Sequence, residues 1–375
     1  VAFIRLGSDL NKNYYQIEVP LKPTPFSDDS SNRLSSEEVW LPDHNSIDIP
    51  ISILSKIKSQ VIGKDRQDPI YFDENLNQVE EFSLISVLPG DKKYKLSIKG
   101  NPSLGSIKNM MIGVKNPSIN LGDNLCGEVW FNELRIAGIE AKGGWAAIGA
   151  LDGNISDLAN FSLTGKFSTI GFGSLDQSPN QRSREEIKQY DIVSNVDLGR
   201  FFPDKWGIEI PFNYSTGRTV ITPEYDPFYQ DLLLDDRLKS INSKELRDSI
   251  RNQAIDFTDR KSINFIGVRK SNKSEKSRFY NIENFSFSYS YNELKHNNYE
   301  IRNQERIRLN LAANYSYSFK PFEINPFYEN KTLNESKYLK WLKEFNLNLL
   351  PSSISFNPKI DRSFNRQRFR QVYIE

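Results

Sequence analysis

The chain has 375 residues, of which 38% are hydrophobic, 26% charged and 12% aromatic, and its 49 basic and 48 acidic residues nearly cancel. No stretch approaches the ~20 consecutive apolar residues that a membrane-crossing helix needs, which excludes a bundle of such helices, whereas membrane β-strands alternate and are compatible with this polar average. The balanced charge does not indicate nucleic-acid binding. Because Cys126 is the only cysteine, an intrachain disulfide and a cysteine zinc site are excluded.

The chain opens on VAFIRLGSDL, a string typical of a strand inside a domain. It contains no initiator methionine, no charged n-region and no apolar h-region, so we expect no signal peptide in this segment. We expect the sequence to be an internal segment of a longer chain, in which case the missing signal peptide says nothing about location.

Short strand candidates, separated by turn residues such as the Pro-Gly pair at 89–90, fill residues 1–141. They are 14–21, 46–54, 81–88, 93–100, 110–116 and 127–138. In the last candidate both faces are partly apolar, which is typical of a strand buried between two layers. We therefore predict a non-barrel domain over residues 1–141, with a β-sandwich or jelly-roll fold.

From residue 142 onward the strand candidates become longer and alternate more strictly. They include 158–170, 206–215, 284–292 and 307–319. The last one exceeds the about 5–6 residues of a typical globular strand and is long enough to provide the ~9–11 residues of a strand that crosses a bilayer. Residues 142–375 thus predict antiparallel strands of a large, partial transmembrane β-barrel, in an all-β protein.

The segment ENFSFSYSYNEL, residues 283–294, illustrates the alternation, because its aromatic and small polar side chains point to opposite faces of a strand. In a soluble sandwich the aromatic face would lie in the core, and in a membrane barrel it would contact lipid. The polar faces of these strands carry mostly Ser, Thr and Asn rather than the Lys and Glu of a soluble sandwich, and this favours the barrel.

The connections between the long strands differ in length. FFPDKW at 201–206 reads as a tight turn, whereas 217–261 is a connection of roughly 45 residues, which is uncommon in a compact domain and ordinary in an outer-membrane barrel. Within it, residues 243–257 have apolar side chains at helical spacing. A second amphipathic helix is predicted at 335–345.

The direction of the chain near 345–360 has two readings. The string FNLNLLPSSISF fits one interrupted strand, and it also fits a hairpin around Pro351. The second reading would reverse the direction of every later strand.

Motifs that carry chemistry are absent from the sequence. His44 and His296 each stand alone among loop residues, and there is no paired-histidine zinc motif, nucleophile elbow or phosphate loop. The acidic clusters at 27–32 and 234–238 lack EF-hand spacing and read as polar loops. We expect no catalytic residues, no metal site and no cofactor.

Several long strings resemble one known family. They are GEVWFNELRIAGIEAKGGWAA (127–147), ITPEYDP (221–227), NIENFSFSYSYNEL (281–294), KPFE (320–323) and KYLKWLKEFNLNLLPSSISFNPKIDRSFN (337–365). In this order they resemble the SprA/Sov family of gliding-motility cell-surface proteins. That family forms the outer-membrane translocon of the type IX secretion system in Bacteroidota. The resemblance covers most of this chain and only a piece of the family's much longer chain.

The resemblance implies a very large single-chain barrel with inserted domains, through whose lumen secreted proteins pass already folded. It implies no enzymatic activity and no catalytic residue to carry over. The expected partners are membrane lipid, secreted cargo in transit and other type IX secretion subunits, the expected location is the bacterial outer membrane, and no nucleic acid is expected.

Together with the alternation, the resemblance assigns the two faces of the strands. The side chains predicted to face lipid are Phe285, Phe287, Tyr289, Tyr291, Leu309, Leu311, Tyr315 and Tyr317. Those predicted to face the lumen are Ser286, Ser288, Ser290, Asn310, Asn314 and Ser316. Small polar groups suit a conduit, because a passing protein then meets few apolar surfaces.

Three other classes stay open on the sequence alone. One is a soluble or cell-surface β-sandwich protein that binds carbohydrate, which the N-terminal region by itself would support. Another is a polysaccharide hydrolase with a jelly roll and a dispersed carboxylate pair. The third is a different outer-membrane barrel, such as a nutrient transporter, which would share the strand pattern.

Overall fold

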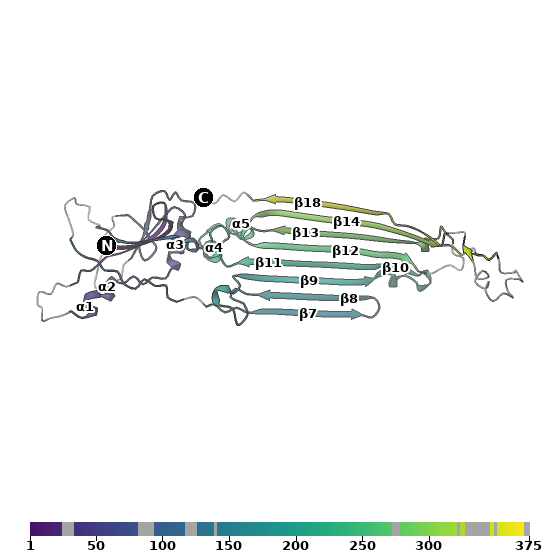
Figure 1. Cartoon of the computed structure of the whole chain (residues 1–375), viewed down its shortest axis with the longest axis horizontal. Coiled ribbons are helices and arrows are strands. Elements are labelled where there is room, and N and C mark those ends of the chain that lie inside the picture. The colour runs from purple at the N-terminus through teal and green to yellow at the C-terminus, as the bar shows by residue number, and fades with distance from the viewer. Residues whose placement is uncertain are drawn as a thin grey trace, which may run out of the picture.

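The structure is a computed structural model. It describes residues 1–24, 34–81, 94–116, 126–138, 141–271, 278–320, 323–326, 346–348 and 351–370. Two antiparallel sheets dominate these residues: a six-stranded sheet in the N-terminal unit and a ten-stranded sheet, called the wall below. Figure 1 shows the N-terminal unit at one end of the wall, with helices α4 (Leu234–Lys239) and α5 (Lys244–Ala254) between them. The predicted predominance of antiparallel β-structure is confirmed.

The sheet of the N-terminal unit has the order β4-β3-β5-β2-β1-β6, and every pair in it is antiparallel. Its strands are β1 (Ala2–Asp9), β2 (Asn13–Val19), β3 (Ile70–Phe72), β4 (Gln78–Val79), β5 (Lys95–Lys99) and β6 (Asn109–Val114). Ile4 lies opposite Ile17, and Ile17 lies opposite Leu96. Because strand side chains alternate, these residues share one face, and that face is buried.

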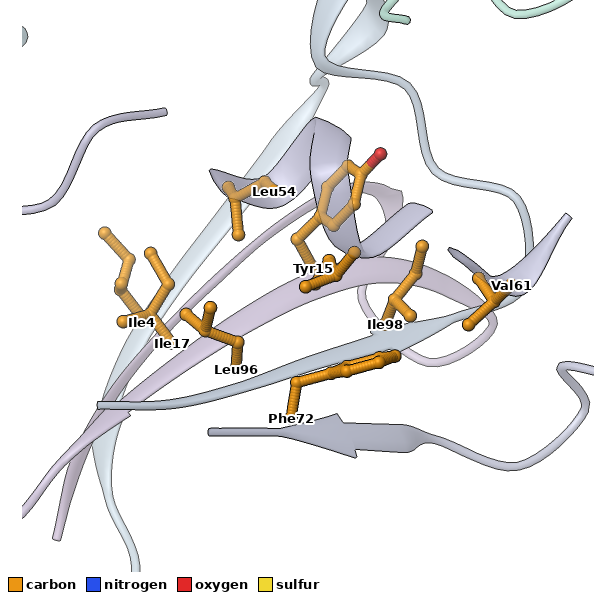
Figure 2. Packing of buried hydrophobic residues seen from close by; sticks show 9 residues of the cluster. Ile4, Tyr15, Ile17, Leu54, Val61, Phe72, Leu96 and Ile98 are labelled. Carbon is orange, nitrogen blue, oxygen red and sulfur yellow. The ribbon is translucent and has the colours of Figure 1, made fainter. Parts of the chain in front are cut away.

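Helix α3 (Ser52–Val61) covers this face of the sheet. Its buried side chains Leu54, Ile57 and Val61 recur every three or four residues and contact the apolar residues of β1, β2, β3 and β5 (Figure 2). The prediction of a strand at 46–54 is therefore wrong, because this string runs into the start of α3. A short apolar string fits both periods, and the burial of the helical face beyond residue 54 decides for the helix.

A sheet with a helix on one face takes the place of the two-sheet sandwich predicted for the N-terminal region, as far as the described residues go. The predicted buried strand at 127–138 is also wrong. This segment has no regular secondary structure, and Trp130 and Ile136 are 72% and 79% exposed. No described strand pairs with it, so its apolar residues stay uncovered.

The other helices are short. They are α1 (Ser36–Trp40), α2 (Pro42–Asn45) and the 3-10 turns η1 (Leu104–Ser106), η2 (Pro179–Gln181), η3 (Leu198–Phe201), η4 (Asp204–Trp206) and η5 (Ile282–Asn284). Within the described ranges, no helix has the length and apolar character needed to cross a membrane. Residues 27–32, 82–88 and 335–345, on which an acidic loop, most of a strand and a helix were predicted, lie outside the described residues.

The wall is a meander in which strands that follow one another in the chain lie side by side (Figure 1). Its order is β17-β14-β13-β12-β11-β9-β8-β7, with β10 beside β12 and β18 beside β14. The strands are β7 (Ala146–Ile155), β8 (Ala159–Ser168), β9 (Glu185–Asp197), β10 (Ile208–Glu209), β11 (Pro211–Pro223), β12 (Asp256–Lys270), β13 (Phe285–Asn297), β14 (Ile301–Ser318), β17 (Ser353–Phe356) and β18 (Lys359–Phe369). The longest of them, β14, has 18 residues.

Both readings of residues 345–360, one interrupted strand and a hairpin around Pro351, are wrong for the described residues, because Leu347–Asn348 and Ser353–Phe356 belong to different sheets. Strands β17 and β18 both pair antiparallel with β14, so the chain after Pro351 returns along β14 as one strand with a break near Pro358. Strand β16 (Leu347–Asn348) pairs instead with β15 (Glu323–Ile324), forming a two-stranded ribbon outside the wall.

The long connection between β11 and β12 is shorter than the predicted 217–261. Residues 217–221 pair with 256–260 as part of the wall, so the connection is 224–255. The Thr, Arg, Asp and Lys residues there concealed the strand pattern, because they place polar groups on both faces. The predicted helix within 243–257 is confirmed as α5, Lys244–Ala254.

The connection has a core of its own. The buried carboxylate of Asp226 accepts hydrogen bonds from the backbone N–H groups of Phe228 and Tyr229, at 2.8 and 3.2 Å, and forms an ion pair with Arg237 of α4. Leu232 and Leu234 are almost fully buried. These contacts give the connection a defined shape.

The connection meets the N-terminal unit at a buried ionic contact. Asp231 accepts hydrogen bonds from Lys58 Nζ of α3 at 2.7 Å and from the Tyr15 hydroxyl of β2 at 2.8 Å, and Lys58 also donates to the Pro102 carbonyl at 2.7 Å. The side chains of Lys58 and Asp231 are 2% and 1% exposed. Burial lowers the pKa of Lys58, and Asp231 opposes that shift. Loss of either side chain would therefore leave the other one buried without its counter-charge.

We expect Ile57→Ala to lower the free energy of unfolding of the N-terminal unit by about 2–5 kcal/mol, because it leaves a cavity between α3 and the sheet. The matched control is Lys56→Ala on the exposed side of the same helix, for which a change within about 0.5 kcal/mol is expected. Protease cleavage of the full-length protein across a urea series measures both. Equal midpoints for the two variants would contradict the packing of α3.

We expect Asp231→Asn to destabilise the contact between the N-terminal unit and the connection by about 3–5 kcal/mol, because it leaves the Lys58 ammonium buried without a counter-charge. The double variant Asp231→Asn with Lys58→Met removes both charges and should recover part of that loss. Cleavage of the 224–255 connection across the urea series reports on this contact. If the double variant lost as much stability as Asp231→Asn and Lys58→Met lose separately, taken together, the two side chains would act independently.

Candidate functional site: a strand wall with two different faces

Aromatic and branched side chains form one face of the wall. Phe285 lies opposite Tyr315, and Tyr289 lies opposite Leu311. Residues directly opposite in an antiparallel pair share a face, so the side chains predicted to face lipid lie together on this apolar face. They are Phe285, Phe287, Tyr289, Tyr291, Leu309, Leu311, Tyr315 and Tyr317.

Rings on the apolar face contact one another across several strands. The ring centroids of Phe212 and Phe265 lie 5.0 Å apart, those of Phe265 and Tyr289 6.4 Å, and those of Phe285 and Tyr315 4.9 Å. Phe287 is nevertheless 52% exposed. Among the described residues, no second sheet covers this face. The apolar face is therefore a continuous surface over β11, β12, β13 and β14.

The apolar face has a defined height. On β14 every second side chain from Ile307 to Tyr317 is apolar or aromatic. These about ten residue steps span roughly 34 Å along a strand at about 3.4 Å each, and a strand tilt of about 40° reduces this to roughly 26 Å, which matches the ~25 Å apolar band of an outer-membrane barrel.

A charged row limits the apolar face on the side of the 224–255 connection. Glu305 of β14 lies opposite Lys295, which lies opposite Asp259 of β12, which in turn lies opposite Arg218 of β11. Arg218 Nε donates to Asp259 Oδ1 at 3.0 Å. Such charges are stable where the apolar band meets water and costly at its centre.

The other face of the wall is polar. Ser286 lies opposite Asn314, and Ser290 opposite Asn310. The side chains predicted to face the lumen thus lie together on this polar face; they are Ser286, Ser288, Ser290, Asn310, Asn314 and Ser316. Whether the apolar face contacts lipid and the polar face a lumen stays a prediction.

Side chains on the polar face form a hydrogen-bonded chain across the wall. Asn195 donates to Asn160 at 2.7 Å, Asn213 to Asn195 at 2.6 Å, and Asn264 to Asn213 at 2.9 Å. Ser290 Oγ then donates to the Asn264 side-chain oxygen at 2.6 Å. These five residues come from β8, β9, β11, β12 and β13, so the chain runs perpendicular to the strands.

A β-bulge interrupts the regular pairing of β12 with β13. The register shifts between Phe265 and Val268, and Gly267 adopts a positive φ of 71°. Its backbone N–H donates to Ser288 Oγ at 3.0 Å. The extra residue leaves Val268 opposite Phe287, so both stay on the apolar face.

The isolated histidines do not form a site. His296, expected in a loop, is part of β13, where its Nδ1 lies 3.0 Å from the Thr258 hydroxyl. His44 lies in α2. In the part of the chain that the structure describes, no three His, Cys, Asp or Glu side chains are arranged to hold a metal ion.

Sequence reasoning missed the asparagine chain and the Lys58–Asp231 contact. Each asparagine is visible on the polar face of its own strand, but only the strand registers bring Asn160, Asn195 and Asn213 to one level. Lys58 and Asp231 are separated by 173 residues, and no local pattern links them.

The comparisons with known proteins identify one matching family. The family model SprA_N, described as "Motility related/secretion protein", matches residues 1–238, which include the N-terminal unit and the wall from β7 to β11. None of the curated proteins compared with the chain matches it. Because the family match spans more than half of the sequence, the chain belongs to the SprA_N family of motility-related and secretion proteins.

Proposed function

We propose that the wall is part of an outer-membrane channel that exports folded proteins, in type IX secretion and gliding motility. One observation carries the proposal: long strands form an apolar face of bilayer height that is backed by a face of small polar side chains. The coarser function, a role related to motility or secretion, follows from the family. That the chain forms part of a channel, and that this channel lies in the outer membrane, is our proposal.

Two partners of such a channel correspond to the two surfaces of the wall. Membrane lipid contacts the apolar face, where Phe287 and Leu311 are 52% and 40% exposed. Secreted cargo passes along the polar face, whose Ser and Asn side chains offer hydrogen bonds without an apolar surface to which a folded protein would adhere. Other type IX secretion subunits complete the assembly. The proposal assigns no catalytic residue and no cofactor.

The exposed apolar face argues against a soluble carbohydrate-binding sandwich. In such a fold a second sheet packs about 10 Å away and buries the aromatic face. In the described residues the wall has no such second sheet, and rings of this face contact one another across neighbouring strands of the wall.

The decisive experiment fractionates native cell envelopes with an antibody against the 224–255 connection. Retention in the outer-membrane pellet through an alkaline carbonate wash, with release by detergent, is expected for an integral wall. Depletion of the protein should then abolish secretion of folded type IX cargo and leave small-nutrient uptake unchanged. Release by carbonate would overturn the membrane location, and a loss of uptake with intact secretion would indicate a transporter.

Lysine substitutions on adjacent residues test which face contacts lipid. Phe287→Lys should cost about 2–4 kcal/mol near the bilayer midplane and reduce assembly, because it places a charge on the lipid face. Ser286→Lys, one residue away on the polar face, is the matched control and should assemble normally. The folded fraction in the outer membrane, read from heat-modifiable migration on a gel, measures both. Normal assembly of Phe287→Lys with loss of Ser286→Lys would invert the two faces.

A further inference from the structure

The asparagine chain is part of a longer row that crosses the whole wall. Successive Cα partners place one polar residue from each of eight strands at the same level. In order from β7 to β18 they are Asn154, Asn160, Asn195, Asn213, Asn264, Ser290, Asn310 and Asp361, called the asparagine row below.

Composition alone does not account for this row. The next row on the same face, beginning at Asp152, contains Val193 and Arg308 among serines, and the row beyond it contains Gly217 and Leu294. Amides at one level can donate and accept along the sheet, as asparagine ladders do in stacked strands. From Asn160 to Ser290 the repeated residue type therefore coincides with a repeated side-chain hydrogen bond.

The asparagine row distinguishes between strand registers that the alternation of apolar and polar faces does not distinguish. A slip of one residue between two strands inverts the faces, so apolar burial prevents it. A slip of two residues keeps both faces intact, and only specific side-chain pairs oppose it. Such a slip would place Asn213 opposite a residue other than Asn195 and break the hydrogen bond between them. The asparagine row thus identifies the correct register among those that preserve the faces.

The row ends at two edges of different chemistry. Strand β18, KIDRSFNRQRF, carries Lys359, Arg362, Arg366 and Arg368, and basic side chains discourage further strand pairing. Strand β7, AAIGALDGNI, has no lysine, arginine or proline, and it pairs with β8 along its whole length without a bulge. Leu151 and Ile155 on it are 59% and 54% exposed. An unprotected, regular edge of this kind is suited to accept another strand.

We propose that β7 pairs, in the assembled protein, with an antiparallel strand from outside the wall that places a hydrogen-bonding side chain, asparagine or serine, directly opposite Asn154. The same strand places apolar side chains opposite Gly153 and Ile155, because these residues lie on the apolar face. The inference depends on register and edge chemistry, so it holds whichever face contacts lipid.

Site-specific photo-cross-linking in the full-length protein tests this pairing in native envelopes. The photoreactive residue p-benzoylphenylalanine replaces Asn154 in one variant and Ile155 in another, and mass spectrometry identifies each residue captured. Replacement of Asn160 is the positive control, because its neighbours Asn154 and Asn195 are known. We expect the Asn154 variant to capture an asparagine or a serine, and the Ile155 variant to capture an apolar residue next to it in the chain.

A disulfide then tests the register. In a Cys126→Ser background, Asn154→Cys combined with cysteine at the captured position should cross-link under mild oxidation, because directly opposite residues meet the distance requirement. Cysteine two positions further along the partner strand should react at least ten-fold less. Capture of any residue other than asparagine or serine at position 154 would overturn the proposal. So would capture of β18 or of β7 from a second copy, or no capture while the Asn160 control succeeds.

Discussion

Hydrogen bonds between the backbones of neighbouring strands are the constraint on which the rest of the wall depends. Each inner strand donates and accepts on both sides, and this pairing runs without a register shift from β7 to β12 along the main path of the sheet. Because directly opposite residues share a face, backbone pairing converts short alternating strings into two continuous surfaces. At the bulge before Val268 a single extra residue shifts the register and keeps the faces intact, and a further shift lies at the end of β14, between Ile301 and Asn303, where it pairs with β18.

The two surfaces differ in what their side chains contact. Rings on the apolar face lie within about van der Waals reach of their neighbours, and charges are grouped at its border near the connection. On the polar face, the part of the asparagine row from Asn160 to Ser290 is joined by side-chain hydrogen bonds between neighbouring strands. A large sheet with a repetitive polar face would otherwise tolerate slips of two residues, so side-chain hydrogen bonds add the selectivity that backbone pairing does not provide.

The N-terminal unit is attached to this wall through the 224–255 connection. A long insertion needs burial to acquire a fixed shape, and here Asp226, Leu232 and Leu234 supply it. Asp231 then joins the insertion to α3 and β2 through Lys58 and Tyr15. A buried ion pair of this kind adds specificity of docking rather than large net stability, since the desolvation of both charges offsets much of their attraction. In the proposed channel this contact holds the N-terminal unit at one end of the wall.

The sequence by itself determined the antiparallel β-class, the long alternating strands, helix α5 and the family. Each of these follows from local periodicity or from long idiosyncratic strings. It misassigned 46–54, where a short apolar string fits two periods, and 127–138, where apolar residues on both faces suggested a covering layer that the described structure lacks. It placed the ends of the 217–261 connection inside what proved to be strands. Only the tertiary structure decided the asparagine row and the Lys58–Asp231 contact. The local sequence pattern shows which side of a helix or strand is apolar. Strand register depends on pairing, and buried ion pairs depend on desolvation, of residues that are far apart in the chain.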